Sequence, residues 1–127
     1  MRKEVELWFR QALSDLRTAR NNIKVKEYAA SVFFCQQASE KALKALFIHK
    51  FKQMPLKTHN LLELAREIKV PKQIFNLLLD LNPEYITTRY PDAANGLPDE
   101  MYNKELAILH LKKAEKVVKW VEKKIKK

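Results

Sequence analysis

The chain has 127 residues, of which 46% are hydrophobic and 31% are charged, a balance typical of one folded domain and not of a disordered chain. No apolar run approaches the roughly 18 residues that a membrane-spanning helix needs, and the first ten residues lack the apolar core of a signal peptide. We therefore expect a single cytosolic domain over residues 1–127 with no membrane contact. Cys35 is the one cysteine, so no internal disulfide is expected, and its apolar neighbours predict a buried thiol.

The formal net charge is +10, and it is concentrated near the C-terminus. Residues 112–127 contain eight lysines and two glutamates, a net charge of +6. This pattern fits a solvated lysine face on a terminal helix. It also fits a patch for nucleic acid, an acidic partner or an anionic surface. Because the excess is lysine without interleaved arginine or glycine, the signal for nucleic acid is weak.

Apolar residues at alternating spacings of four and three predict two long helices in the first half of the chain. The first spans about residues 4–22, where the positions from Val5 to Ile23 follow this spacing. The second spans about residues 26–51 and has apolar residues on two faces. A helix that is apolar on two faces packs between neighbours, so we expect the second helix at the centre of the fold.

Cap and turn residues divide the second half of the chain. Asn60, with Glu63 three residues later, predicts the start of a short third helix. Pro71 predicts the end of that helix and the start of a fourth. Asn82 and Pro83 then predict a break or a kink.

The segment 85–102 is expected to be an irregular loop, because it holds the only glycine, Gly96, between Pro91 and Pro98. A last helix is expected from just after Asp99 to the C-terminus, with the same apolar spacing as the first helix. We expect these two helices to pack nearly antiparallel. No strand pattern is present, so the sequence predicts an all-α, up-and-down bundle of four to five helices with a long loop before the last helix.

The sequence lacks the common catalytic motifs. It contains no P-loop, no GxGxxG, no HExxH and no CxxC. His49, His59 and His110 are scattered and show no metal-ligand spacing. Paired carboxylates of the kind that hold two metal ions in helical bundles are also absent. We therefore expect no metal site and no cofactor.

Two polar residues interrupt an apolar face of the predicted second helix. Gln36 and Glu40 lie one turn apart on this face, and a carboxylate there needs a partner or an opening to solvent. Lys44, four residues after Glu40, is in the favourable position for an ion pair on a helix. These residues either form a polar pair at the edge of the core or belong to a binding site.

Two further features point to a site. His59 stands at the mouth of the third helix, where it either caps the helix or binds an anion or acts as an acid–base group. Arg89 lies between Tyr85 and Tyr90 and is followed by a Tyr-Pro turn, which favours a pre-ordered arginine for a phosphate or a carboxylate. Arg89 is equally compatible with a structural role, tying the loop to a helix C-terminus.

Four stretches together resemble the HEPN family, the small helical-bundle domains named from higher eukaryotes and prokaryotes. They are "WFRQALSDLRTA", "YAASVFFCQQASEKALKALF", "THNLLEL" and "PEYITTRYP". The resemblance implies a four- or five-helix up-and-down fold that usually dimerises. Many prokaryotic members pair with a small minimal nucleotidyltransferase as a toxin–antitoxin system. Other members are metal-independent ribonucleases or have been proposed to bind nucleotides.

The ribonuclease members have an arginine and a histidine four to six residues apart. No histidine follows any of the six arginines of this chain at that distance. We therefore expect a binding module for a nucleotide or an RNA phosphate, or for a nucleotidyltransferase partner. The alternatives are a dimeric, metal-independent ribonuclease with His59 as acid–base group and Arg89 as phosphate stabiliser, and a purely structural partner module. The expected ligand-binding residues are Gln36, Glu40, Lys44, His59, Tyr85, Arg89 and Tyr90, with a tyrosine able to stack on a base.

Overall fold

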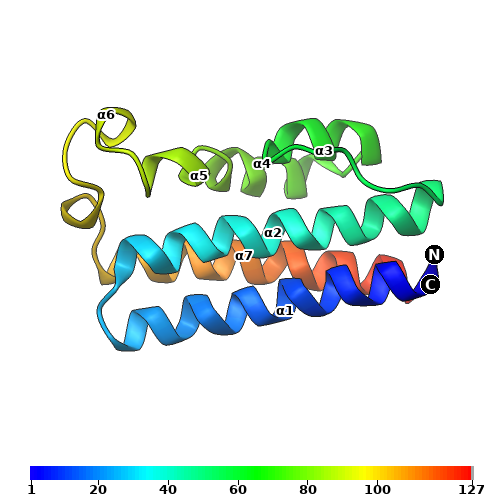
Figure 1. Ribbon diagram of the computed structural model, residues 1–127, viewed down its shortest axis with the longest axis horizontal. Coiled ribbons are helices and arrows are strands. Elements are labelled where there is room, and N and C mark those ends of the chain that lie inside the picture. Colours follow the sequence, from blue (N-terminus) through cyan, green and yellow to red (C-terminus); the bar gives the residue numbers. More distant parts are fainter. Residues whose placement is uncertain (127) are drawn as a thin grey trace.

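The computed structural model describes residues 1–126, and this part of the chain is helical with no strand. Three long helices run along the length of the molecule: α1 (Arg2–Lys24), α2 (Tyr28–Phe51) and α7 (Lys104–Ile125). Figure 1 shows α1 and α7 running in opposite directions, which confirms the predicted antiparallel arrangement. None of the described helices is long and apolar enough to cross a membrane.

Helix α2 lies at the centre of the bundle, as its two apolar faces predicted. It packs against α1, α7 and α3, and the residues from Ala42 to Ile48 are all buried. On the α1 side, small residues such as Ala12 and Ala19 are fully buried and let the two helices approach closely. The Ser31 hydroxyl uses this approach to donate a hydrogen bond to the Ala19 carbonyl at 2.8 Å.

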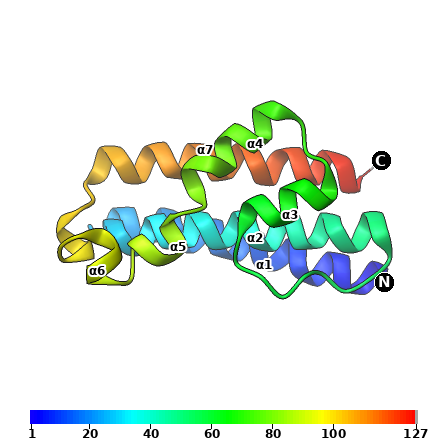
Figure 2. The ribbon, with the colours of Figure 1, turned by 90° about the horizontal axis from the view of Figure 1, so that it is seen from above.

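Two shorter helices, α3 (Leu61–Ile68) and α4 (Lys72–Leu81), cover the face of the bundle opposite α1. Seen from above in Figure 2, α3 lies against α2, and α4 lies over α7 and also contacts α2. The Asn60 side chain accepts from the backbone N–H groups of Leu62 and Glu63 at 2.9 and 3.3 Å, which confirms the predicted N-cap. Pro71 precedes α4, also as predicted.

The segment between α4 and α7 contains more helix than the expected irregular loop. It forms two single-turn helices, α5 (Glu84–Thr87) and α6 (Pro91–Ala94), followed by a 3₁₀ turn, η1 (Pro98–Glu100). Gly96 has φ +157° and a side chain there would meet Met101, which accounts for the lone glycine. These turns are too short to show a helical period in the sequence.

The last helix begins later than the sequence predicted. The Asn103 side chain accepts from the backbone N–H of Leu106 at 2.9 Å and caps α7, so the helix starts at Lys104. Residues 98–100 instead form the separate 3₁₀ turn. The first helix is also slightly longer than the predicted 4–22, by two residues at each end.

Candidate functional site

A buried carboxylate on α2 is the centre of a polar cluster. Glu40 has only 2% of its surface exposed. One of its oxygens accepts from Lys44 Nζ at 3.1 Å, which confirms the predicted ion pair. The other oxygen faces His59 Nδ1 at 2.9 Å. Because an ionised carboxylate only accepts hydrogen bonds, this geometry places a proton on Nδ1 of His59.

Two neighbouring glutamines attach the loop before α3 to α2. Gln36 is fully buried and its amide donates to the His59 carbonyl at 2.9 Å. The amide of Gln37 donates to the Gln36 side-chain oxygen at 2.8 Å and approaches Glu40 at 3.3 Å. The Gln36 amide therefore has a partner at its nitrogen and another at its oxygen, and its bond to the His59 carbonyl holds His59 in place through the backbone.

The His59 ring continues the cluster toward α5. It stacks on Tyr85, with ring centroids 4.1 Å apart and planes 12° apart. Tyr85 also contacts Phe33 of α2 at a centroid distance of 5.9 Å. The carboxylate of Glu40 and the ring of Tyr85 therefore fix His59 from two sides. Half of the His59 side chain, 53%, is still exposed.

Arg89 lies over an aromatic surface at the edge of this cluster. Its guanidinium carbon is 5.1 Å from the ring centroids of Phe33 and Tyr85 and 5.6 Å from that of Tyr90. These are cation–π distances. Within residues 1–126 the guanidinium makes no hydrogen bond and no ion pair, and the residue is exposed. The structure thus holds a positive charge at the surface with its N–H donors free.

All seven site residues predicted from the sequence fall into one connected cluster. They differ in depth. Gln36, Glu40 and Lys44 are buried, Tyr85 is half-buried, and the other three are exposed. The cap at the start of α3 is Asn60, so His59 is not used for capping. The connected residues are Gln36, Glu40, Lys44, His59, Tyr85, Arg89 and Tyr90.

Sequence reasoning missed two residues of this cluster. Phe33 provides one of the rings beneath Arg89, and its place among the apolar residues of the second helix gave no sign of this contact. Gln37 connects Glu40 to Asp15 of α1 through Lys41. The side-chain oxygen of Gln37 accepts from Lys41, and Lys41 pairs with Asp15 at 3.2 Å. The doubled glutamine in the middle of an apolar helix was the available signal, since a buried amide needs partners.

A second polar cluster, also missed, lies behind α5. Glu84 accepts from the Tyr102 hydroxyl at 2.6 Å and pairs with His110 Nε2 at 2.8 Å. These residues are distant in the sequence and no local pattern connects them. The only signals for this cluster in the sequence were Glu84 beside Pro83 and His110 on the apolar side of the last helix.

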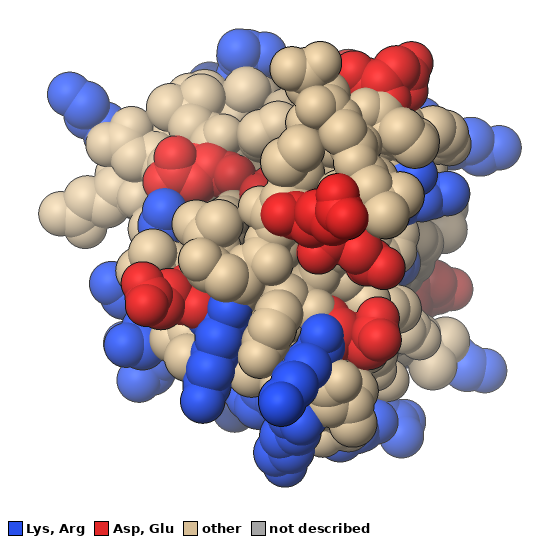
Figure 3. Space-filling model, turned by 90° about the vertical axis from the view of Figure 1, so that its left-hand side faces the viewer, with Lys and Arg blue, Asp and Glu red and all other residues tan. Residues whose placement is uncertain are grey.

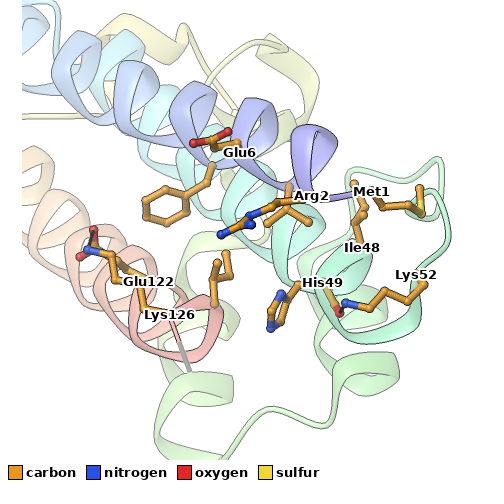
Figure 4. A pocket seen from close by; sticks show the side chains of 11 residues that line it. Met1, Arg2, Glu6, Ile48, His49, Lys52, Glu122 and Lys126 are labelled. Carbon is orange, nitrogen blue, oxygen red and sulfur yellow. Dashed lines mark hydrogen bonds and ion pairs between the residues drawn. The ribbon is translucent and has the colours of Figure 1, made fainter.

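Two cavities of the molecule lie away from the predicted residues. A hollow of about 820 Å³ lies between the start of α1 and the ends of α2 and α7. Figure 4 shows the Arg2 side chain reaching into it beside His49. A smaller one of about 540 Å³ is lined by Trp120 and Lys124 among others. Neither is lined by a residue of the Glu40–His59 cluster. The cluster reaches the surface through His59, Arg89 and Tyr90, which are exposed.

Charge is unevenly distributed over the molecule. Figure 3 shows acidic side chains gathered at the end where the segment between α5 and α7 turns back, with lysines and arginines around them. Asp92, Asp99, Glu100 and Glu105 belong to this end and are exposed. The basic excess therefore comes from other surfaces, and residues 112–127 contribute a net +6 to it. Among residues 1–126, no group of three or more metal-ligating side chains is present.

Comparison with known proteins gives concordant matches. A family model for the HEPN domain matches residues 5–124. A protein of Methanocaldococcus jannaschii, named "Putative toxin MJ1304", is 31% identical over 134 residues, covering 94% of this chain and 87% of that protein.

Solved structures resemble the whole fold. TT1696 from Thermus thermophilus superposes with a TM-score of 0.85 at 33% identity, covering 94% of this chain and 97% of that one. ST0689, described as an archaeal HEPN homologue, gives 0.83 at 30% identity, with 95% and 97% covered. A HEPN domain protein from Thermotoga maritima gives 0.74 at 21% identity, with 94% and 98% covered, and supports the fold alone.

Proposed function

Because the chain belongs to the HEPN domain family, we propose that it is a binding module that takes the phosphate of a nucleotide or an RNA at Arg89 and His59. The observation that carries this proposal is the exposed Arg89 guanidinium, held over three aromatic rings with its donors unpaired in the described chain. A guanidinium fixed in this way matches the geometry of a phosphate.

The other cluster residues have separate roles in this proposal. Gln36, Glu40 and Lys44 are buried and already bonded to one another or to His59, so they support the site and do not contact the ligand. The Tyr85 ring is already covered by His59 and approached by Arg89. Base stacking therefore falls to Tyr90, which is 47% exposed.

The geometry of His59 favours a second candidate function, metal-independent cleavage of RNA. A histidine with Nδ1 bonded to a carboxylate presents Nε2 for proton transfer, and half of this ring is exposed. In such a reaction Nε2 would take the proton of the attacking 2′-hydroxyl, and Arg89 would stabilise the negative charge on the oxygens of the pentacovalent phosphorane. The bond from phosphorus to the 5′-oxygen would then break, leaving a 2′,3′-cyclic phosphate, and the departing 5′-oxygen would take a proton from water. The toxin name of the Methanocaldococcus relative is in keeping with this alternative.

Assembly with another chain is part of the proposal. HEPN domains typically dimerise, and we propose a homodimer, with a minimal nucleotidyltransferase as a further possible partner in a toxin–antitoxin pair. The segment beside Arg89 exposes apolar side chains, among them Ile86 at 52% and Leu97 at 55%. Such side chains are typical of an interaction surface. Light scattering coupled to gel filtration measures whether the chain is a dimer.

One experiment separates these candidates. A labelled structured RNA is incubated in EDTA with the wild type, Arg89→Gln, His59→Gln and the control Arg17→Gln, which removes an exposed charge on α1. The binding module retains intact RNA, and Arg89→Gln weakens retention by about tenfold or more, the loss expected for charge-assisted hydrogen bonds. Cleavage that His59→Gln abolishes establishes the ribonuclease. If the RNA is neither retained nor cleaved, the protein-partner role is the one that remains.

A further inference from the structure

Three side chains from separate parts of the chain meet behind α5. Glu84, the first residue of α5, is only 8% exposed. It accepts from the Tyr102 hydroxyl at 2.6 Å with one oxygen and faces His110 Nε2 of α7 at 2.8 Å with the other. These contacts connect α5 to the start of α7 across the segment that contains α6 and η1. We call Glu84, Tyr102 and His110 the α5 anchor.

The His110 ring has an acceptor at each nitrogen. Nδ1 is 2.8 Å from the Leu106 carbonyl of the preceding helical turn, and Nε2 is 2.8 Å from Glu84. A neutral imidazole has one N–H and satisfies only one of these two contacts. Both are hydrogen bonds when the ring is a cation and Glu84 is ionised. The anchor is therefore complete only in the protonated form of His110.

The surroundings of His110 favour that form. Burial by itself lowers the pKa of His110, but the hydrogen bonds to Glu84 and to the Leu106 carbonyl and the charge of Glu84 outweigh it, so the pKa lies above the ordinary 6.5. Lys113 of α7 opposes the cation, although it pairs with Asp80 of α4 at 2.7 Å.

Two other titratable groups close to Glu84, Cys35 and Tyr102, are uncharged near neutral pH. On the α2 side, burial raises the pKa of the Cys35 thiol to about 12. Burial and the hydrogen bond to Glu84 also raise the pKa of Tyr102, which stays a hydroxyl donor. His110 is therefore the member of the anchor that changes charge as pH rises through its pKa, which lies above 6.5.

The anchor matters because α5 also positions the proposed ligand site. A single helical turn has no stability of its own, so α5 depends on its side-chain contacts. Tyr85, the residue after Glu84, stacks on His59. Thr88 closes the turn by donating from its hydroxyl to the Glu84 carbonyl at 2.6 Å, and Arg89 follows directly. Glu84 thus lies on the buried side of this turn, and Tyr85 and Arg89 lie on its outer side.

We propose that Glu84, Tyr102 and His110 are positioning residues that hold Tyr85 and Arg89 in place, so that loss of the His110 proton releases α5 and weakens phosphate binding. This inference rests on the proposed function for its ligand, but the anchoring itself is a property of the free protein. The site would therefore bind best while His110 is protonated and lose affinity as pH rises through the raised pKa of His110.

The direction of the pH effect follows from linkage. A histidine with a raised pKa in the folded state stabilises that state fully below its unfolded value of 6.5, and the stabilisation is lost as pH rises through the raised value. Since one proton is involved, α5 loosens by at most about tenfold per pH unit above that point. The affinity for a ligand whose binding depends on α5 also falls by at most about tenfold per pH unit.

The test measures anchoring and binding separately. Amide hydrogen exchange gives protection factors for Ile86–Tyr90, whose N–H groups close onto Pro83, Glu84 and Ile86, and filter retention of a labelled single-stranded RNA gives affinity. Both are followed from neutral pH to about pH 9 for the wild type and His110→Gln. Glutamine keeps a donor for Glu84 but does not titrate, so a pH dependence that the wild type shows and His110→Gln lacks comes from His110.

The expected result is a fall in wild-type protection and affinity with rising pH that is absent in His110→Gln. Tyr102→Phe removes one hydrogen bond without changing charge, and it is expected to lower protection while leaving the pH dependence in place. His49→Gln, at the other end of the bundle, is the matched control and is expected to behave as the wild type.

Three outcomes overturn the inference. If protection of Ile86–Tyr90 is independent of pH, or if His110→Gln keeps the wild-type pH dependence, His110 does not control α5. Absence of RNA binding at every pH counts against the proposed function instead, and the exchange data then decide the anchoring alone. If the protection of Ile86–Tyr90 falls with rising pH while the affinity for RNA stays constant, α5 does not position the ligand site.

Discussion

The ion pair between Glu40 and Lys44 provides a sharp test of the central cluster. Both side chains are buried, at 2% and 8% exposure, and Glu40 also accepts from His59 and Gln37. Glu40→Leu leaves the Lys44 ammonium buried without its carboxylate, and removing one partner of such a pair costs about 3–5 kcal/mol. Lys44→Met leaves the carboxylate with two donors, so we expect a smaller loss.

The double variant Glu40→Leu/Lys44→Met distinguishes coupling from simple loss of packing. With both charges removed, the unpaired ammonium is gone, so the double variant is expected to be more stable than Glu40→Leu alone. Urea unfolding with unchanged m-values measures the free energies. A double variant whose loss equals the sum of the two single losses would refute the reasoning, because it would show that the charges do not interact.

Three further results are expected. Leu78→Ala, at a fully buried position of α4, should lower the free energy of unfolding by about 2–5 kcal/mol in urea denaturation. Asn60→Ala should cost about 1 kcal/mol in the same assay, because it removes the cap of α3. Cys35, whose pKa burial raises to about 12, should resist a thiol reagent at pH 8 until the protein is unfolded by denaturant. Fast labelling of the folded chain would contradict its burial.

The helical frame was predictable because it depends on local patterns. Spacings of three and four residues identify the long helices, and Asn60 marks the start of α3 through its own side chain. The turns α5 and α6 were not predictable in this way. Each has four residues, which is about one turn, and their stability comes from contacts such as that of Glu84 with His110.

The sequence predicted which residues form the candidate site, but not how deeply each is buried or which contacts hold it. A carboxylate on the apolar face of α2 required a partner, and Glu40 has partners in Lys44 and His59. The sequence could not show that Gln36 would bond the His59 backbone. Nor could it show that His59 would cover the Tyr85 ring. Both contacts depend on how the loop before α3 folds back, which is a long-range property.

The central claim is that a phosphate ligand binds at Arg89, and locating a bound phosphate tests it most directly. Adenosine monophosphate is titrated into ¹⁵N-labelled protein, and the Arg89 side-chain Nε–H and the backbone amides of Tyr85 and Tyr90 are followed. The account predicts that these signals shift with saturation and that Arg89→Gln abolishes the response. Shifts confined to Arg2 and His49 around the large cavity, or to the lysines of α7, would contradict it.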